Sequence, residues 1–181
     1  MSDLNLETAI ANFTECLIKP WANALGGLLG TACTVTTDQG ALPDPGAKPL
    51  CMALAFEGVL VGDAVLVLTT VDRQTLTIRS GESPQDYAES EVDTHDPAVQ
   101  QSIRQAVVAA LSDFQSKYGP LVARIDPVEL PSWTPLQTLV FSASSADRPA
   151  VHAYLLCHQN LRINPRAMVP ALVHDGNIII E

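Results

Sequence analysis

The sequence predicts an α+β fold in which long helices flank a mostly antiparallel sheet of about six strands. Three observations support this prediction: an amphipathic stretch over residues 96–119, two apolar runs joined by Glu57-Gly58, and further strand-like runs after residue 120. A second amphipathic stretch near the amino terminus precedes the first strands. The chain is therefore expected to form two helix-plus-three-strand halves, although no residue-level repeat connects them.

The first helix is predicted over residues 4–29. Pro20 falls inside it, but the apolar phase continues across the proline, so we expect one kinked helix or two nearly collinear helices. Gly26-Gly27 and Gly30 would loosen and end the helix. One helical face carries the apolar side chains Leu6, Ile10, Phe13, Leu17, Trp21, Leu25 and Leu28.

The segments that follow alternate strand signals with turn signals. Residues 31–37 predict a short strand, and the proline- and glycine-rich residues 38–49 predict a surface loop. Two strands of a hairpin are expected at 50–56 and 59–70. Within the second strand, Gly62 marks a bulge or a point of close packing.

Between the hairpin and the long helix the chain becomes acidic. A short helix is predicted over residues 72–79, capped by Asp72 or Thr70. Residues 82–96 contain no lysine or arginine, which indicates a solvated loop. The alternative, a docking patch for a basic partner or a divalent cation, lacks the ligand spacing of a calcium-binding loop.

The long helix has clear signals at both ends. Asp96 would cap its amino terminus, Pro97 would occupy the first helical position, and Gly119-Pro120 would end it. Its apolar stripe consists of Val99, Ile103, Ala106, Val107, Ala110, Leu111, Phe114 and Tyr118. Its polar face carries Gln101, Arg104, Gln105, Ser112 and Lys117.

Three more strands are expected after the long helix, at residues 121–130, 136–142 and 151–163. Residues 1–163 would then form one α/β domain. Residues 164–181 would form a carboxy-terminal tail, in which an Asp-Gly pair between apolar runs predicts a short hairpin. Such a tail would cover a sheet edge or pair with another subunit.

The composition limits the classes of partner. Lysine and arginine number 10 against 20 aspartates and glutamates, which gives a formal net charge of -10. Such a surface repels phosphate backbones and anionic headgroups, so we expect neither nucleic-acid binding nor membrane insertion. Because no secretory signal and no apolar run of about 20 residues is present, the expected location is cytoplasmic.

The cysteines and histidines do not suggest a reactive centre. No cysteine pair has CxxC spacing, so we expect reduced, structural thiols. His152 and His158 share a sheet face but lie about 20 Å apart at about 3.3 Å per residue, which is too far for one ion. The other residues of these two types are Cys16, Cys33, Cys51, Cys157, His95 and His174. No metal site and no cofactor are predicted.

Several short motifs occur in a recognisable order over residues 6–163. They are Phe56-Glu57-Gly58-Val59-Leu60-Val61-Gly62 in the hairpin, Gly81-Glu82, Arg104-Gln105, Lys117-Tyr118-Gly119 and Pro131-Ser132-Trp133. With the order of helices and strands, they resemble the CheC/CheX/FliY superfamily. The likeness is greater to the CheC-like domain that precedes the rotor domain in some bacterial FliN-type flagellar motor switch proteins.

The resemblance implies a CheC/CheX-like fold and a role in chemotaxis or in the flagellar switch. Two features depart from the family pattern. No rotor-type sequence follows residue 163, so we expect that this chain alone does not build a rotor ring. The phosphatase members carry Glu-x-x-Asn on an exposed helix face, whereas this chain has Ile10 and Ile18 three residues after Glu7 and Glu15.

The long helix lacks the same signature, because it has no carboxylate between Asp96 and Asp113. Hydrolysis of an acyl phosphate needs an amide to align the water and a carboxylate to engage the partner's lysine. We therefore predict a non-catalytic interaction domain without catalytic residues. It would dock a CheY-type response regulator or a flagellar switch protein through Gln101, Arg104 and Gln105.

Two alternatives remain open. One is a divergent CheX/CheC-type phosphatase in which Gln101 or Gln105 places the water and the acidic segment supplies a carboxylate. The other is an acidic export chaperone or adaptor that holds an unfolded client. The tail hairpin and the apolar strands also leave homodimerisation open.

Overall fold

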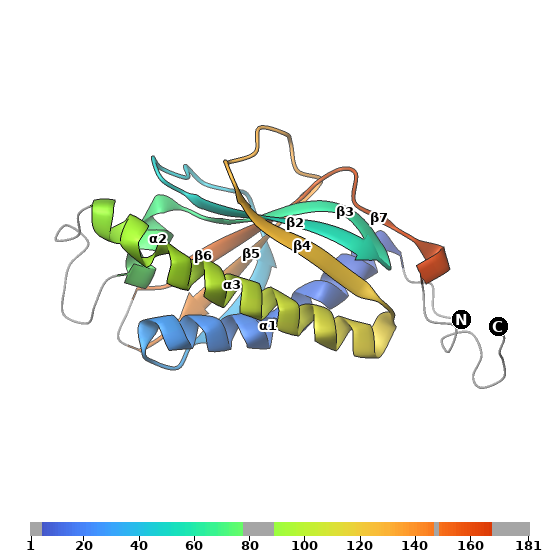
Figure 1. Ribbon diagram of the computed structural model, residues 1–181, viewed down its shortest axis with the longest axis horizontal. Helices are drawn as coiled ribbons and strands as arrows, with labels where there is room; N and C mark the ends of the chain where they lie inside the picture. The colour runs from blue at the N-terminus through green and yellow to red at the C-terminus, as the bar shows by residue number, and fades with distance from the viewer. Residues whose placement is uncertain (1–4, 78–88, 147–148, 168–181) are drawn as a thin grey trace.

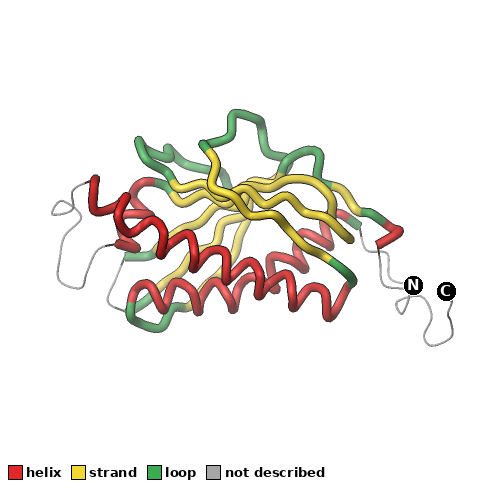
Figure 2. The backbone as a smooth tube through the Cα atoms, in the orientation of Figure 1, coloured by secondary structure: helices red, strands yellow, loops and turns green. Residues whose placement is uncertain are grey.

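The computed structural model describes residues 5–77, 89–146 and 149–167, and these form a sheet with helices packed on one face. The helices α1 (Leu6–Leu29) and α3 (Glu89–Tyr118) lie side by side across that face and run in opposite directions (Figure 1). The short α2 (Thr70–Thr77) lies at one end (Figure 2). This arrangement confirms the predicted α+β class.

The sheet has the strand order β1-β5-β6-β3-β2-β4, and every neighbouring pair is antiparallel. A short additional strand, β7, pairs with the start of β3. The strands are β1 (Thr34–Gln39), β2 (Leu50–Gly58), β3 (Leu60–Leu68), β4 (Leu121–Val128), β5 (Gln137–Ser144), β6 (Val151–Cys157) and β7 (Arg162–Ile163).

The topology confirms the two predicted halves and adds an exchange between them. One half is α1 with β1, β2 and β3, and the other is α3 with β4, β5 and β6. The first strand of each half pairs with the second strand of the other half. Exchanging the labels of the two halves therefore gives the same strand order, read from the opposite edge of the sheet. The fold therefore contains two equivalent junctions between a helix and an edge strand, α1 with β1 and α3 with β4.

The first helix is continuous across its proline, as predicted. Asn5 caps it by accepting a hydrogen bond from the Thr8 N–H (2.8 Å), and Gly30 ends it in the left-handed region with φ 74°. Pro20 costs one backbone hydrogen bond, but the buried face of the helix continues on both sides of it. That face packs on the sheet and on α3.

The cap of α2 corrects the sequence prediction. The capping side chain is Thr69, whose Oγ1 accepts from the Asp72 N–H (3.2 Å) and donates to the Asp72 carboxylate (2.7 Å). The acid lies three residues after the cap, as in a capping box, but it accepts from the hydroxyl of the cap residue. The predicted cap was Asp72 or Thr70, whereas Asp72 lies three residues after the observed cap, Thr69.

The long helix begins earlier than predicted. It starts at Glu89, so Pro97 lies inside it and the predicted loop over residues 82–96 is helical from Glu89 onward. A proline early in a helix removes one hydrogen bond, and acidic residues are favourable near a helix amino terminus. The predicted carboxyl end is confirmed, because the helix stops at Tyr118 and Gly119 has φ 131°.

The last predicted strand is divided by a turn. Strand β6 ends at Cys157, and the Asn160 side chain then binds Asp63, donating to its carboxylate (2.7 Å) and accepting from its backbone N–H (3.0 Å). Gly62 has φ 129° beside Leu161, which confirms the predicted close packing. A 3-10 helix, η2 (Pro165–Ala167), follows β7. The predicted tail hairpin lies outside the described residues and stays a prediction.

Both faces of the sheet carry buried apolar side chains, and the face covered by the helices carries most of them. The main core lies between the sheet and the helices. On the opposite face, a small cluster of Cys51, Val65, Val67, Tyr154 and Leu156 is covered by Leu42 and Trp133. These two residues come from the loops that connect β1 to β2 and β4 to β5, and the second loop rises above the strands in Figure 1.

Candidate functional site

The predicted contact residues lie on the outer side of α3, in two different environments. Gln101 and Gln105 are exposed. Arg104 is half-buried, and its guanidinium donates to the backbone carbonyl of Ile125 in β4. Arg104 therefore helps to hold α3 against the edge of the sheet. The role of the three residues in partner binding stays a prediction.

From residue 97 to residue 112, Arg104 is the only charged residue in the sequence of α3. Val108 is 57% exposed, and no acidic residue occurs between residues 97 and 112. The next carboxylate along the helix, Asp113, pairs with Lys117 (3.3 Å). Hydrogen bonds from Cys16 and from Lys117 lower the pKa of Asp113, so it is ionised and engaged at neutral pH.

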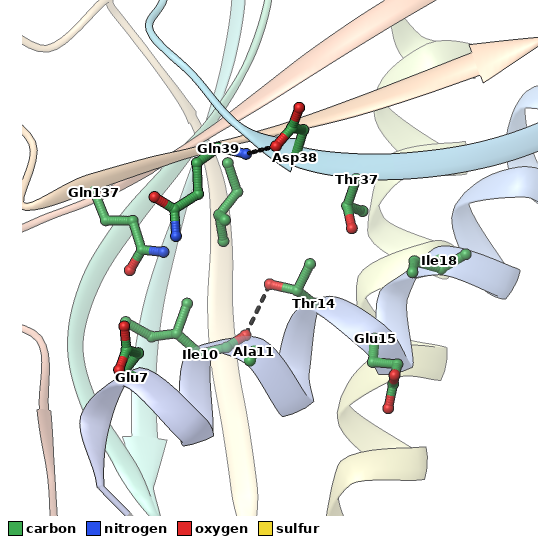
Figure 3. A pocket seen from close by; sticks show the side chains of 11 residues that line it. Glu7, Ile10, Ala11, Thr14, Glu15, Ile18, Thr37, Asp38, Gln39 and Gln137 are labelled. Carbon is green, nitrogen blue, oxygen red and sulfur yellow. Dashed lines mark hydrogen bonds between the residues drawn. The ribbon is translucent and has the colours of Figure 1, made fainter.

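A second candidate surface is a groove between α1, β1 and β5, with a volume of about 440 Å³. We call it the α1–β1 groove. The helix contributes Glu7, Ile10, Ala11, Thr14, Glu15 and Ile18, and the strands contribute Thr37, Asp38, Gln39, Gln137 and Leu139. In Figure 3 the Gln39 and Gln137 side chains point towards α1, whereas the Asp38 carboxylate lies at the rim.

The groove is equipped to bind rather than to form a covalent intermediate. Its carboxylates accept hydrogen bonds, and its amides both donate and accept them. The Thr14 hydroxyl donates a hydrogen bond to the Ile10 carbonyl, one turn earlier in the same helix (2.7 Å). A backbone carbonyl is not a base that could activate this hydroxyl as a nucleophile. No lysine, arginine, histidine or cysteine is among the residues that line it.

The histidines have separate surroundings. The Nδ1 of His152 is 3.7 Å from the Asp72 carboxylate, and the His158 ring packs edge-on against Trp133 at 4.5 Å between ring centroids. Within the described ranges, no group of three or more histidine, cysteine, aspartate or glutamate side chains is placed to hold a metal ion. In the same part of the chain, no helix is long and apolar enough to cross a membrane.

The four cysteines are free thiols, and burial is the largest cause that raises their pKa values. Burial raises the pKa of Cys51 to about 11 and that of Cys157 to about 12, so both are protonated at neutral pH. Burial, with a contribution from Asp113, raises the pKa of Cys16 to about 11. Because the thiolate is the nucleophile, the raised pKa values lower the reactivity of these thiols at neutral pH.

Sequence reasoning missed the α1–β1 groove. It considered Glu7 and Glu15 only as the acids of a failed Glu-x-x-Asn signature. A weak signal was present, since Glu7, Ala11 and Glu15 recur every four residues and so mark one exposed edge beside the apolar stripe. The strand side of the groove could not be found, because it depends on the pairing of β1 with β5.

No family model matches the sequence, and no curated protein matches it with significance. Solved structures do match. A chain of the CheX-CheY-BeF3-Mg2+ complex from Borrelia burgdorferi is similar with a TM-score of 0.54 and 9% identity, over 81% of this chain and 98% of that chain. A chain of the FliM-SpeE complex from H. pylori is similar with a TM-score of 0.56 and 10% identity, over 82% and 85%.

FliY from Thermotoga maritima is similar with a TM-score of 0.50 and 14% identity, over 80% of this chain and 85% of that chain. At such identities the similarity concerns the arrangement of helices and strands. It extends over most of the chain in all three cases. The chain thus has the fold of these CheX, FliM and FliY structures, which is the fold that the resemblance in the sequence implied.

Proposed function

We propose that this protein is a non-catalytic docking domain of a chemotaxis or flagellar switch system. It binds a CheY-type response regulator or a switch protein through the outer side of α3. Two similar structures were determined as complexes that contain such proteins, a CheX-CheY complex from Borrelia burgdorferi and a FliG-FliM complex from H. pylori. The similarity of fold supports a role in a chemotaxis or flagellar switch system, and the surface of α3 supports docking of a partner.

The observation that carries the proposal is the chemistry of α3 between residues 97 and 112. Gln101, Gln105 and Val108 are exposed there, and the segment has no carboxylate. Amides and an exposed apolar side chain can hydrogen-bond and pack against a folded partner. Without an acid, the same surface lacks the carboxylate, which is one of the two groups needed to hydrolyse an acyl phosphate.

The test is binding of a CheY-type regulator, with and without beryllofluoride, measured by calorimetry. The double variant Gln101→Ala/Gln105→Ala should raise Kd about tenfold, which is about 1.4 kcal/mol. As a control, Gln159→Ala removes an exposed amide outside α3 and should leave Kd unchanged. Equal losses in the double variant and the control would argue against docking through this surface.

The second candidate function is a divergent phosphatase. One observation favours it: the α1–β1 groove combines the Glu7 carboxylate with the amides of Gln39 and Gln137 (Figure 3). In a separate phosphate-release assay with a phosphorylated regulator, release should equal spontaneous decay if the protein only docks. Turnover lost in Gln101→Ala/Gln105→Ala would place a catalyst on α3. Turnover lost in Gln39→Ala/Gln137→Ala would place it in the groove.

A further inference from the structure

The two equivalent junctions between a helix and an edge strand are built differently. At the α3–β4 junction, side chains of the helix reach the strand. Arg104 donates to the Ile125 carbonyl, and the Gln115 amide donates to the Leu121 carbonyl (2.7 Å). Donors on α3 therefore satisfy backbone carbonyls of the edge strand β4, and these hydrogen bonds link the helix directly to the strand.

The α1–β1 junction lacks such hydrogen bonds between helix and strand among the described residues. The α1–β1 groove lies between the two elements. The helix side of this groove presents Glu7 and Glu15, which accept hydrogen bonds but cannot donate them when ionised. As an edge strand, β1 also leaves backbone groups of its outer edge without a strand partner.

The carboxylates of the groove thus have no lysine, arginine or histidine among the residues that line it, and a cation from outside the described chain would complement them. The spacing of the two acids constrains the spacing of such cations. Glu7 and Glu15 are eight residues apart on one face of α1, which is about 12 Å at about 1.5 Å per residue. Between them the groove is apolar, with Ile10 and Ala11 on the helix and Leu139 on β5.

We propose that the α1–β1 groove receives an extended basic segment of a partner protein. Two arginines of the segment bind the carboxylates of α1 and donate to carbonyls of β1, as Arg104 donates to a carbonyl of β4 at the other junction. In an extended chain, residues four positions apart are separated by about 13 Å, which matches the separation of the two acids. The residue midway between the arginines is apolar and packs on the floor of the groove.

This surface is separate from the α3 surface of the proposed function. It lies on the other helix and at the opposite edge of the sheet. Arginine is the expected cation because its planar guanidinium can bind a carboxylate and a carbonyl at once. The net charge of -10 attracts such a segment and opposes a nucleic acid.

The test uses a short end-blocked peptide with two arginines four residues apart, leucine midway and serine elsewhere, titrated into the full chain. Amide NMR shifts should change along α1 and β1. Glu7→Gln and Glu15→Gln should each weaken binding about three- to fivefold, and the double variant about tenfold, as for exposed charge pairs. The control Glu57→Gln removes the same charge from the exposed hairpin and should leave the affinity unchanged.

A peptide with its arginines two residues apart should bind more weakly, because it cannot reach both acids. The proposal is overturned if Glu57→Gln weakens binding as much as Glu7→Gln, or if the shifts fall on α3. It is also overturned if the peptide does not saturate. The variant Gln101→Ala/Gln105→Ala should leave peptide binding unchanged, so a failure here can be distinguished from a failure of α3 docking.

Discussion

The carboxylate of Asp72 joins α2 to the sheet. The residue is 6% exposed, and one of its oxygens accepts from the Thr69 hydroxyl (2.7 Å). Its other oxygen accepts from the backbone N–H of His152 in β6 (2.9 Å), a residue 80 positions away in the chain. A single side chain thus completes the cap of a helix and satisfies a backbone donor of a strand.

At this residue we expect a large effect of truncation. Asp72→Ala leaves the Thr69 hydroxyl and the His152 N–H without their common acceptor, which should lower the free energy of unfolding by about 2–3 kcal/mol. Asp72→Asn keeps an acceptor oxygen and should cost less. Urea denaturation measures both variants. A loss below about 0.5 kcal/mol in the alanine variant would show that the contact to β6 is not needed.

At the scale of the elements, two glycines illustrate how position decides the effect of the same substitution. Gly62 in β3 has φ 129°, and an added Cβ would lie 2.6 Å from the Leu161 Cα and 2.8 Å from the Asn160 carbonyl oxygen. Gly27 lies in α1 with nothing within 4 Å of an added Cβ. Only the first glycine is required by the fold.

The two alanine variants should therefore change stability in opposite directions. Gly62→Ala meets backbone atoms and should destabilise the protein by at least about 2 kcal/mol, because the turn after β6 has to move. Gly27→Ala should stabilise it by about 0.5–1 kcal/mol, through the lower backbone entropy of the unfolded chain. Thermal unfolding of the pair tests this. Equal effects of the two variants would contradict the close contact between β3 and the turn.

At the scale of the whole molecule, the ionisation of three buried thiols links the stability of the fold to pH. Cys16, Cys51 and Cys157 are buried. Cys51 and Cys157 lie on opposite faces of the sheet, in the small and the main apolar cluster. Since burial raises the pKa of each thiol above its ordinary value of 9.0, the native state retains protons that the unfolded state loses in alkaline solution.

The consequence is an alkaline loss of stability. Above pH 9 the unfolded chain binds fewer protons than the native chain, so the free energy of unfolding falls as pH rises. For Cys157, whose pKa is about 12, the fall should be about 1 kcal/mol between about pH 9 and 10. Cys157→Ala should lose less stability over this interval. The same slope in both proteins would show that the thiol does not titrate on unfolding.

Much of the architecture could be predicted because it is encoded over short distances. The apolar stripe of α1, the glycine that ends α3 and the two apolar runs of the β2–β3 hairpin each involve neighbouring residues. Errors arose where local signals compete, as at Pro97, which was expected to start α3 and lies inside it. They also arose at Thr69, where the capping pattern identified the right segment but the wrong residue.

The sequence by itself determined the two halves, the family resemblance and the absence of an acid on the outer side of α3 between residues 97 and 112. Only the tertiary structure decided the exchange of β1 and β4 between the halves, and with it the two helix–edge junctions. The reason is that strand partners are chosen by contacts among distant residues, which no local periodicity records. The same long-range pairing assigned Arg104 to the β4 backbone and left the α1–β1 groove open.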